Sequence, residues 1–310
     1  MTSKKIFITG KGQLGSFFQE YFIEKGAEVF VFGSELDVRD ENMLRKKVEE
    51  INPDLLIHTA AKTNIDWCEQ NKLECFAINT LGADNVAKIC AEKDIYLVHI
   101  SSGCVLESKS AEDAQTEEVK PSPLCYYSWT KVWAEEMISH RARKQGLKTL
   151  ILRPRQLLSA KVSPRNALTK MLTYDKFIDM PNSCTVIEDL MFAVDELIKK
   201  DATGVFNVAN PGVTTPYEIA LALKEIIKPE MEFKKISKEE LNRMTLAERV
   251  DAVLDTTKLR NEGIILKEIH ERMREVMRDL KKNLEGDAAK TVLEKTKKET
   301  EEKLGLKSLS

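Results

Sequence analysis

The chain has 310 residues, enough for one large domain or two smaller ones, and its 48 basic residues nearly balance its 50 acidic residues. A net charge of −2 gives no basic field of the kind that nucleic acid or an anionic membrane would select, so the composition favours a small-molecule ligand. The start MTSKKIFITG leads directly into a strand pattern and no apolar run is long enough to span a bilayer, so we expect a cytoplasmic protein.

Short apolar runs alternate with helical patterns through the first half of the chain. The expected strands are KIFITG, EVFVFG, DLLIHTA, YLVHISS and LKTLILR. The helices expected between them cover residues 13–25, residues 41–50, a segment that ends at Lys93 and a segment that contains YSWTK. Strands that alternate with helices predict an α/β fold with a doubly wound parallel sheet and right-handed crossovers.

The second half of the chain divides between this sheet and a smaller lobe. After Arg153 the pattern loosens, and a helix over residues 186–200 and the strand GVFNVAN are then expected to rejoin the sheet. We expect a sheet domain of residues 1–155 and about 186–212, a lobe of about 156–185 and 213–285, and a charged helical tail of 286–310. The lobe should cover the carboxyl ends of the strands, where such sheets bind ligands. The tail is expected to be solvated, with an oligomer contact as the alternative.

The six cysteines are scattered without the Cys-x-x-Cys spacing of zinc sites, and the four histidines are isolated in the sequence. We therefore expect no metal site. Nothing points to secretion, so free thiols are expected, most of them as small buried apolar side chains. The cysteines are Cys68, Cys75, Cys90, Cys104, Cys125 and Cys184.

The sequence GKGQLG follows the first strand and opens a helix, which is the context of a dinucleotide-binding turn. Gly10 allows a tight turn, Gly12 allows close approach to a pyrophosphate, and Gly15 allows the helix to pack against the strand. The helix N-terminus then faces the phosphates. The predicted cofactor site is the whole turn: Gly10, Lys11, Gly12, Gln13, Leu14 and Gly15.

The turn after the second strand bears on the choice between NADH and NADPH. NAD-preferring sites place a carboxylate about 20 residues after the glycine turn, at the end of this strand. Glu35 lies near that position but beyond the expected strand end, and no arginine lies in the turn. Ser34 and Lys11 could accept a 2′-phosphate, so the turn favours NADPH.

Ser102, Tyr127 and Lys131 form a candidate site for carbonyl chemistry. Ser102 ends the strand YLVHISS, and Tyr127 and Lys131 of YSWTK lie one helical turn apart, so their side chains share a face. An ammonium beside a phenol favours phenolate through its charge. A carbonyl substrate above the strand ends could meet these groups and the nicotinamide at one oxyanion site.

The chain resembles the extended short-chain dehydrogenase/reductases, in particular the dTDP-4-dehydrorhamnose reductase family, through GKGQLG, LDVRD, PDLLIHTAAKT, FAINTLGADNVA, LVHISS and YSWTK. It is closer still to the bifunctional nucleotide-rhamnose synthases through NIDWCEQNK, SSGCVLE, NPGV and LRPRQLLSAKVSPRNALTKMLTYDKFIDMPNSCTV. The resemblance covers residues 5 to 230. It implies a Rossmann sheet, NAD(P)H as cofactor, a nucleotide-sugar substrate and, as in many relatives, a homodimer. The glycine turn is one residue shorter than is usual in extended members.

The resemblance also implies roles for single residues. Ala60 and Ala61 would join the cofactor site. Cys104 matches a cysteine that serves as an epimerisation acid or base, and Lys170 matches the second group. Moving a stereocentre beside a ketone requires one group to take a proton from one face and another to return a proton to the opposite face. The alternatives are a packed thiol for Cys104 and a solvated helical lysine for Lys170.

Three asparagine and arginine positions complete the resemblance. Arg165, Asn166 and Asn182 match substrate or cofactor-loop contacts, with loop capping as the alternative reading. Asn79 is expected to support the strand that carries Ser102.

The leading hypothesis is an NAD(P)H-dependent 3,5-epimerase/4-reductase that makes nucleotide L-rhamnose from a UDP- or dTDP-linked 4-keto-6-deoxy-D-glucose. One alternative is a simple dTDP-4-dehydrorhamnose reductase, against which Cys104 argues. Another is a regulatory subunit that binds NADP without turnover, against which the intact Ser102, Tyr127 and Lys131 set argues.

Overall fold

A six-stranded parallel sheet forms the centre of the computed structural model, which describes residues 4–305, with side chains through residue 300. Its strand order is β2-β1-β3-β4-β5-β9, and every neighbouring pair is parallel. The strands are β1 (Lys5–Thr9), β2 (Glu28–Phe32), β3 (Leu55–His58), β4 (Tyr96–Ile100), β5 (Thr149–Pro154) and β9 (Gly204–Val208). The expected doubly wound sheet is confirmed. The chain order reverses between β1 and β3, and ligands bind at such a reversal.

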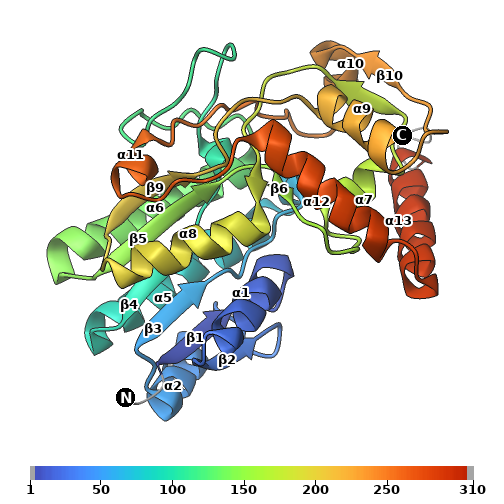
Figure 1. Cartoon of the computed structure of the whole chain (residues 1–310). Coiled ribbons are helices and arrows are strands. Elements are labelled where there is room, and N and C mark those ends of the chain that lie inside the picture. The colour runs from blue at the N-terminus through green and yellow to red at the C-terminus, as the bar shows by residue number, and fades with distance from the viewer. Residues whose placement is uncertain (1–3, 306–310) are drawn as a thin grey trace.

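Helices cover both faces of the sheet (Figure 1). One face packs against α1 (Gln13–Glu24) and α8 (Ile187–Lys199), and the other against α2 (Glu41–Ile51), α5 (Gly82–Lys93) and α6 (Tyr126–Gln145). Successive residues of β1 divide between these layers, with Ile6 and Ile8 on the α8 side and Phe7 on the α5 side. This alternation buries both faces, which explains why the strands read as continuous apolar runs.

The segment between β3 and β4 differs from the single helix that the sequence pattern suggested. It forms α3 (Ile65–Gln70), α4 (Lys72–Phe76), a π-helical turn over Ala77–Leu81 and then α5. The Asn64 side chain accepts from the Trp67 amide and starts α3, while Asn71 ends α3 and begins α4. Periodicity alone does not reveal such breaks, because each piece keeps helical spacing.

A smaller lobe lies beyond the carboxyl ends of the strands and has its own apolar cluster. It contains the two-stranded pairs β6-β8 and β7-β10. Its strands are β6 (Leu157–Leu158), β7 (Lys176–Ile178), β8 (Thr185–Val186) and β10 (Lys234–Ile236). Its helices are α7 (Ala167–Met171), α9 (Pro216–Ile226), α10 (Lys238–Met244) and α12 (Ile269–Asn283), and a short helix, α11 (Thr257–Asn261), returns to β9.

The charged C-terminal segment forms α13 (Asp287–Gly305). In contrast to the solvated tail that its composition suggested, one face of α13 packs against α7, and both Ala289 and Thr296 are buried. Across residues 4–305, no helix combines the length and apolar character needed to cross a membrane.

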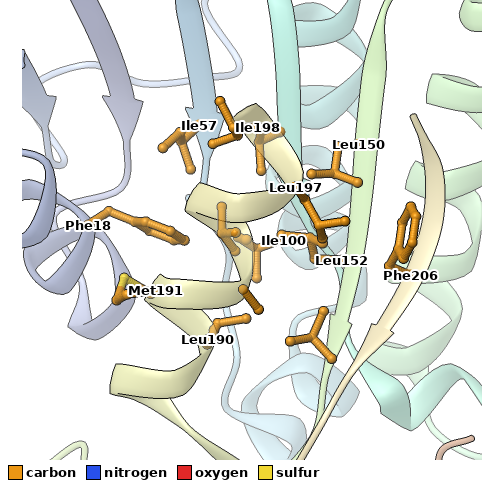
Figure 2. Close-up of a cluster of buried hydrophobic side chains, with 14 of the residues drawn as sticks. Phe18, Ile57, Ile100, Leu150, Leu152, Leu190, Met191, Leu197, Ile198 and Phe206 are labelled. Atoms are coloured by element: carbon orange, nitrogen blue, oxygen red, sulfur yellow. The ribbon is translucent and has the colours of Figure 1, made fainter. Parts of the chain in front are cut away.

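Helices α1 and α8 pack against each other within the apolar core on one face of the sheet. Phe18 of α1 is fully buried and points toward α8, which carries Leu190, Met191 and Leu197 (Figure 2). Ile23, on the same helix, is 52% exposed.

We expect Phe18→Ala to lower the free energy of unfolding by about 3–5 kcal/mol, because it removes buried apolar surface and leaves a cavity. Ile23→Ala, the matched control, should change it by about 0.5 kcal/mol or less. Urea denaturation of both variants measures the difference. Equal effects of the two substitutions would contradict this packing.

Candidate active site

The glycine turn is shaped by close backbone contacts. Gly10 has a φ of +91°, and a Cβ there would lie 2.6 Å from the Ala60 nitrogen, so the position requires glycine. At Gly15 a Cβ would lie 1.9 Å from the Gly10 carbonyl oxygen. The Thr59 hydroxyl donates to that carbonyl at 2.9 Å, a support that sequence analysis missed. Gly12 is the N-cap of α1 and no side chain caps the helix, so the helix N-terminus can receive an anion.

The turn opens into a cleft of about 1060 Å³ along the carboxyl ends of the strands. Except for Gly15, which is buried against the turn, every predicted cofactor residue lines this cleft. These residues are Gly10, Lys11, Gly12, Gln13, Leu14, Ser34, Ala60, Ala61 and Lys131.

The charge of the cleft is predominantly positive. Six cationic side chains line it, against three carboxylates from Glu35, Asp37 and Glu74. The cations are Lys11, Arg39, Lys62, Lys131, Arg165 and Lys170. Although the whole chain is nearly neutral, this excess creates a local field that suits ligands with several phosphates.

The turn after β2 presents both signs of charge. Glu35 lies beyond the end of β2, where its carboxylate accepts from the Gly33 amide at 2.7 Å, and this bond, with Lys11 nearby, lowers the Glu35 pKa. Arg39 lies farther along and pairs with Asp37 at 2.6 Å. Arg39 belongs to the segment LDVRD, but its position in the sequence alone indicated no role in the cleft.

The structure brings Ser102, Tyr127 and Lys131 together at the end of β4. Tyr127 and Lys131 lie on α6, and the Lys131 ammonium donates to the Ile100 carbonyl at 2.8 Å. Ser102 lies two residues after Ile100 and within hydrogen-bonding reach of the Tyr127 phenol. All three predicted residues line the same cleft.

Burial dominates the electrostatics of this group. It raises the pKa of Tyr127 well above the usual value, the neighbouring Cys104 adds to this, and the hydrogen bond with Ser102 acts in the opposite direction. Burial also lowers the pKa of Lys131 to about 8. The lowered Tyr127 pKa that the spacing of Lys131 suggested is therefore not found, because loss of hydration is the largest cause of the shift. A protonated phenol can donate a proton to a carbonyl oxygen.

A buried ion pair holds helix α6, which carries Tyr127 and Lys131, against the neighbouring strands. Glu135 lies one helical turn after Lys131 and accepts from Arg153 of β5 at 2.5 Å and from the Ser101 hydroxyl. Side chains of this pair are 4% and 6% exposed, so each charge depends on the other. The pair joins α6 to β4 and β5, and sequence patterns gave no signal for it.

Two histidines that are distant in the sequence stack beneath the cleft. His58 and His99 pair across β3 and β4, with ring centroids 5.2 Å apart. Burial lowers the pKa of His58 to about 3, and the Lys131 cation acts in the same direction. Both rings are therefore neutral.

Asn79 supports a different element from the expected one. Its side chain accepts from the Lys62 amide at 2.7 Å and donates to the Lys62 carbonyl at 2.9 Å. It also donates to Thr130 of α6. Asn79 thus fixes the loop after β3, which lines the cleft, rather than the strand that carries Ser102.

Cys104 lies beside the site but does not line the cleft. It is 3% exposed in an apolar cluster that also holds Tyr127, and its amide donates to the Ser102 hydroxyl at 3.3 Å. Cys68, Cys75 and Cys125 belong to the same cluster. All six cysteines are free and buried.

The predicted site residues of the lobe form two groups: some line the cleft, and others are buried away from it. Arg165 and Lys170 line the cleft, with the Arg165 guanidinium above Gly12, near the predicted phosphate position. Asn166 is fully buried, caps α7 and donates to the carbonyls of Ser159 and Lys161.

Asn182 is also buried away from the cleft wall. Its side chain accepts from Arg155 and from the Ala252 amide, and it donates to Asp251. These bonds correspond to the loop-capping alternative, and substrate contact by Asn166 and Asn182 stays a prediction.

Comparisons with known proteins agree with this architecture. A family model described as the RmlD substrate binding domain matches residues 4–282. A bifunctional dTDP-4-dehydrorhamnose 3,5-epimerase/dTDP-4-dehydrorhamnose reductase of Arabidopsis thaliana is 32% identical over 235 residues, covering 73% of this chain and 76% of the relative. A trifunctional UDP-glucose 4,6-dehydratase/UDP-4-keto-6-deoxy-D-glucose 3,5-epimerase/UDP-4-keto-L-rhamnose-reductase of the same plant is 30% identical, covering 84% of this chain and 40% of the relative.

Solved structures show the same relationship. The L780 UDP-rhamnose synthase of Acanthamoeba polyphaga mimivirus has a TM-score of 0.81 at 28% identity, covering 89% of this chain and 99% of that one. A dTDP-4-dehydrorhamnose reductase of Bacillus anthracis in complex with NADP has a TM-score of 0.79 at 25% identity, covering 88% of this chain and 98% of that one. The expected resemblance is confirmed: the chain belongs to the RmlD substrate binding domain family and is an oxidoreductase of the NAD(P)H-using dTDP/UDP-4-dehydrorhamnose reductases, which include bifunctional epimerase/reductases.

Proposed function

We propose that this protein converts a nucleotide-linked 4-keto-6-deoxy-D-glucose, carried on UDP or dTDP, into nucleotide L-rhamnose. It would epimerise C3 and C5 and then reduce C4. The observation that carries the proposal is that Ser102, Tyr127 and Lys170 line one cleft with the glycine turn, while Cys104 adjoins Tyr127. The bifunctional relative from Arabidopsis thaliana supports it.

The cleft fits a nicotinamide dinucleotide. The glycine turn and the uncapped start of α1 would hold the pyrophosphate, with Arg165 above Gly12. Lys11, Ser34 and Arg39 would hold a 2′-phosphate, which favours NADPH. When bound, NAD(P)H supplies the hydride that C4 receives.

Ser102 and Tyr127 would form the oxyanion site of the reduction. Both would donate hydrogen bonds to the C4 carbonyl oxygen, and the Tyr127 phenol, kept protonated by burial, would give its proton to that oxygen. Lys131 would stabilise the resulting phenolate and bind the nicotinamide ribose. The bond from the Lys131 ammonium to the Ile100 carbonyl, at the end of β4, supports this role.

Epimerisation would use the same oxyanion site. Removing the proton at C3 or C5 places negative charge on the C4 oxygen, which Ser102 and Tyr127 would stabilise as an enolate. Cys104 and Lys170 would act as the acid and base on opposite faces of the sugar. Cys104 lies in the turn after β4 and Lys170 lies on α7 of the lobe, so the two groups come from different parts of the fold.

One observation favours a second candidate, a monofunctional 4-reductase. Cys104 is buried and does not line the cleft, as expected for a packed thiol. The two functions differ in whether solvent protons enter C3 and C5.

We expect Cys104→Ser to lose epimerisation, because a hydroxyl is a far weaker base than a thiolate, by about 100-fold or more. Reduction of an already epimerised ketone should stay within about twofold of the wild type, because it does not require Cys104. Product analysis by NMR in deuterated water measures both activities. Cys125→Ser is the matched control, since Cys125 lies in the same cluster and already contacts the Ser128 hydroxyl. Parallel loss of both activities in Cys104→Ser would indicate a packing role.

Lys131 should set the alkaline limit of cofactor use. Because burial lowers its pKa to about 8, the ammonium is present below about pH 8 and is lost above it. The kcat/KM for NADPH should therefore be constant below this pH and fall about tenfold per unit above it, as measured by initial rates. Lys131→Met should have a lower kcat/KM for NADPH, and its kcat/KM should not fall as the pH rises above about 8. A wild-type profile that stays flat to pH 10 would contradict the assignment.

A further inference from the structure

Helix α13 lies outside the part of the chain that the family model matches, which ends at residue 282. The charged side chains among residues 287–300 are mostly exposed, but one stripe of the helix faces the lobe. The stripe follows helical spacing: Ala289, Leu293, Thr296 and Thr300. Thr296 is 2% exposed, and Leu293 packs against the lobe cluster.

The partner of this stripe is α7, the helix that carries Lys170. Figure 1 shows α13, in red, beside α7 at the edge of the lobe, and the two helices are in contact. Five residues are too few to form a stable helix without tertiary support. Asn166 caps the start of α7, and α13 packs against this short helix.

A chain of hydrogen-bonding groups connects α13 to the backbone of Lys170. The Thr173 hydroxyl donates to the Lys170 carbonyl at 2.7 Å, and the Thr173 amide donates to the same carbonyl at 2.9 Å. On its other side, Thr173 Oγ1 lies 3.2 Å from Thr300 Oγ1 of α13. Besides the packing of the two helices, Thr173 therefore links the end of α7 to α13.

We propose that α13 is a positioning element for epimerisation: by packing on α7 it sets the place of Lys170 in the cleft. The proposal rests on the role of Lys170 in the proposed function. Proton transfer depends steeply on the distance between donor and acceptor, so a small displacement of α7 would slow it. Reduction at C4 uses Ser102, which caps the turn after β4, and Tyr127 and Lys131 of α6, so it should not require α13.

The test compares two substitutions of the same kind on one helix. Thr296→Asp places a charge in the buried stripe, and Thr291→Asp places it on the exposed side of α13. In deuterated water, we expect Thr296→Asp to slow deuterium entry at C3 or C5 about tenfold, while kcat for reduction of an epimerised ketone stays within about twofold. Thr291→Asp should leave both rates unchanged.

A second variant and a second readout guard against misfolding. Thr300→Val keeps the shape of the side chain but removes its hydroxyl, and we expect a loss of about threefold in deuterium entry alone. In both Thr296→Asp and Thr300→Val, amide hydrogen exchange over residues 166–173 should accelerate, because the Lys170 amide bond to the Asn166 carbonyl opens more often.

The outcomes separate the two proposals. Equal slowing of deuterium entry and reduction, or unchanged amide exchange over residues 166–173 in both variants, would overturn the role of α13. If the wild type takes up no deuterium at C3 or C5, the proposed epimerase activity is wrong. Amide exchange then decides by itself whether α13 holds α7.

Discussion

The buried ammonium of Lys131 ties helix α6 to the carboxyl end of β4, and the site is arranged around this contact. Its bond to the Ile100 carbonyl places Tyr127, one turn earlier on α6, next to Ser102, two residues later on the chain. One turn further along α6, the Glu135–Arg153 pair fixes the same helix to β5. A buried charge is stable only where its partners are held in place, so these contacts require the helix and the strands to keep one register.

Burial and charge have different roles in the cleft. His58 and His99 are buried and neutral beneath the cleft, and Tyr127 is buried and protonated in its wall, so interactions with a developing oxyanion are strong there. Along its open side, Lys11, Arg39 and Arg165 provide the positive field that suits phosphates. The same cleft can therefore attract a highly charged ligand and still keep its reacting oxygen away from water.

The sequence was sufficient for the sheet, the glycine turn and the Ser102, Tyr127 and Lys131 set, because each depends on local spacing and on strand order. It did not predict contacts between residues that are far apart in the chain. Arg39 enters the cleft only through the path of the loop after β2, and the Glu135–Arg153 pair joins residues from different elements. The lowered pKa expected at Tyr127 was wrong for a related reason: spacing shows the neighbouring charge, but desolvation depends on the whole fold. The composition of α13 suggested a solvated helix, because only one stripe of its side chains is buried and most of the rest are polar.

The central claim is that one oxyanion site serves both proton exchange beside the ketone and reduction of the ketone. The most direct measurement is mass and NMR analysis of the sugar that the wild-type protein makes from UDP-4-keto-6-deoxyglucose and NADPH in deuterated water. The account predicts nucleotide L-rhamnose with deuterium at C3 and C5. A 6-deoxyhexose reduced at C4 without deuterium at these positions would contradict it and would identify a plain reductase.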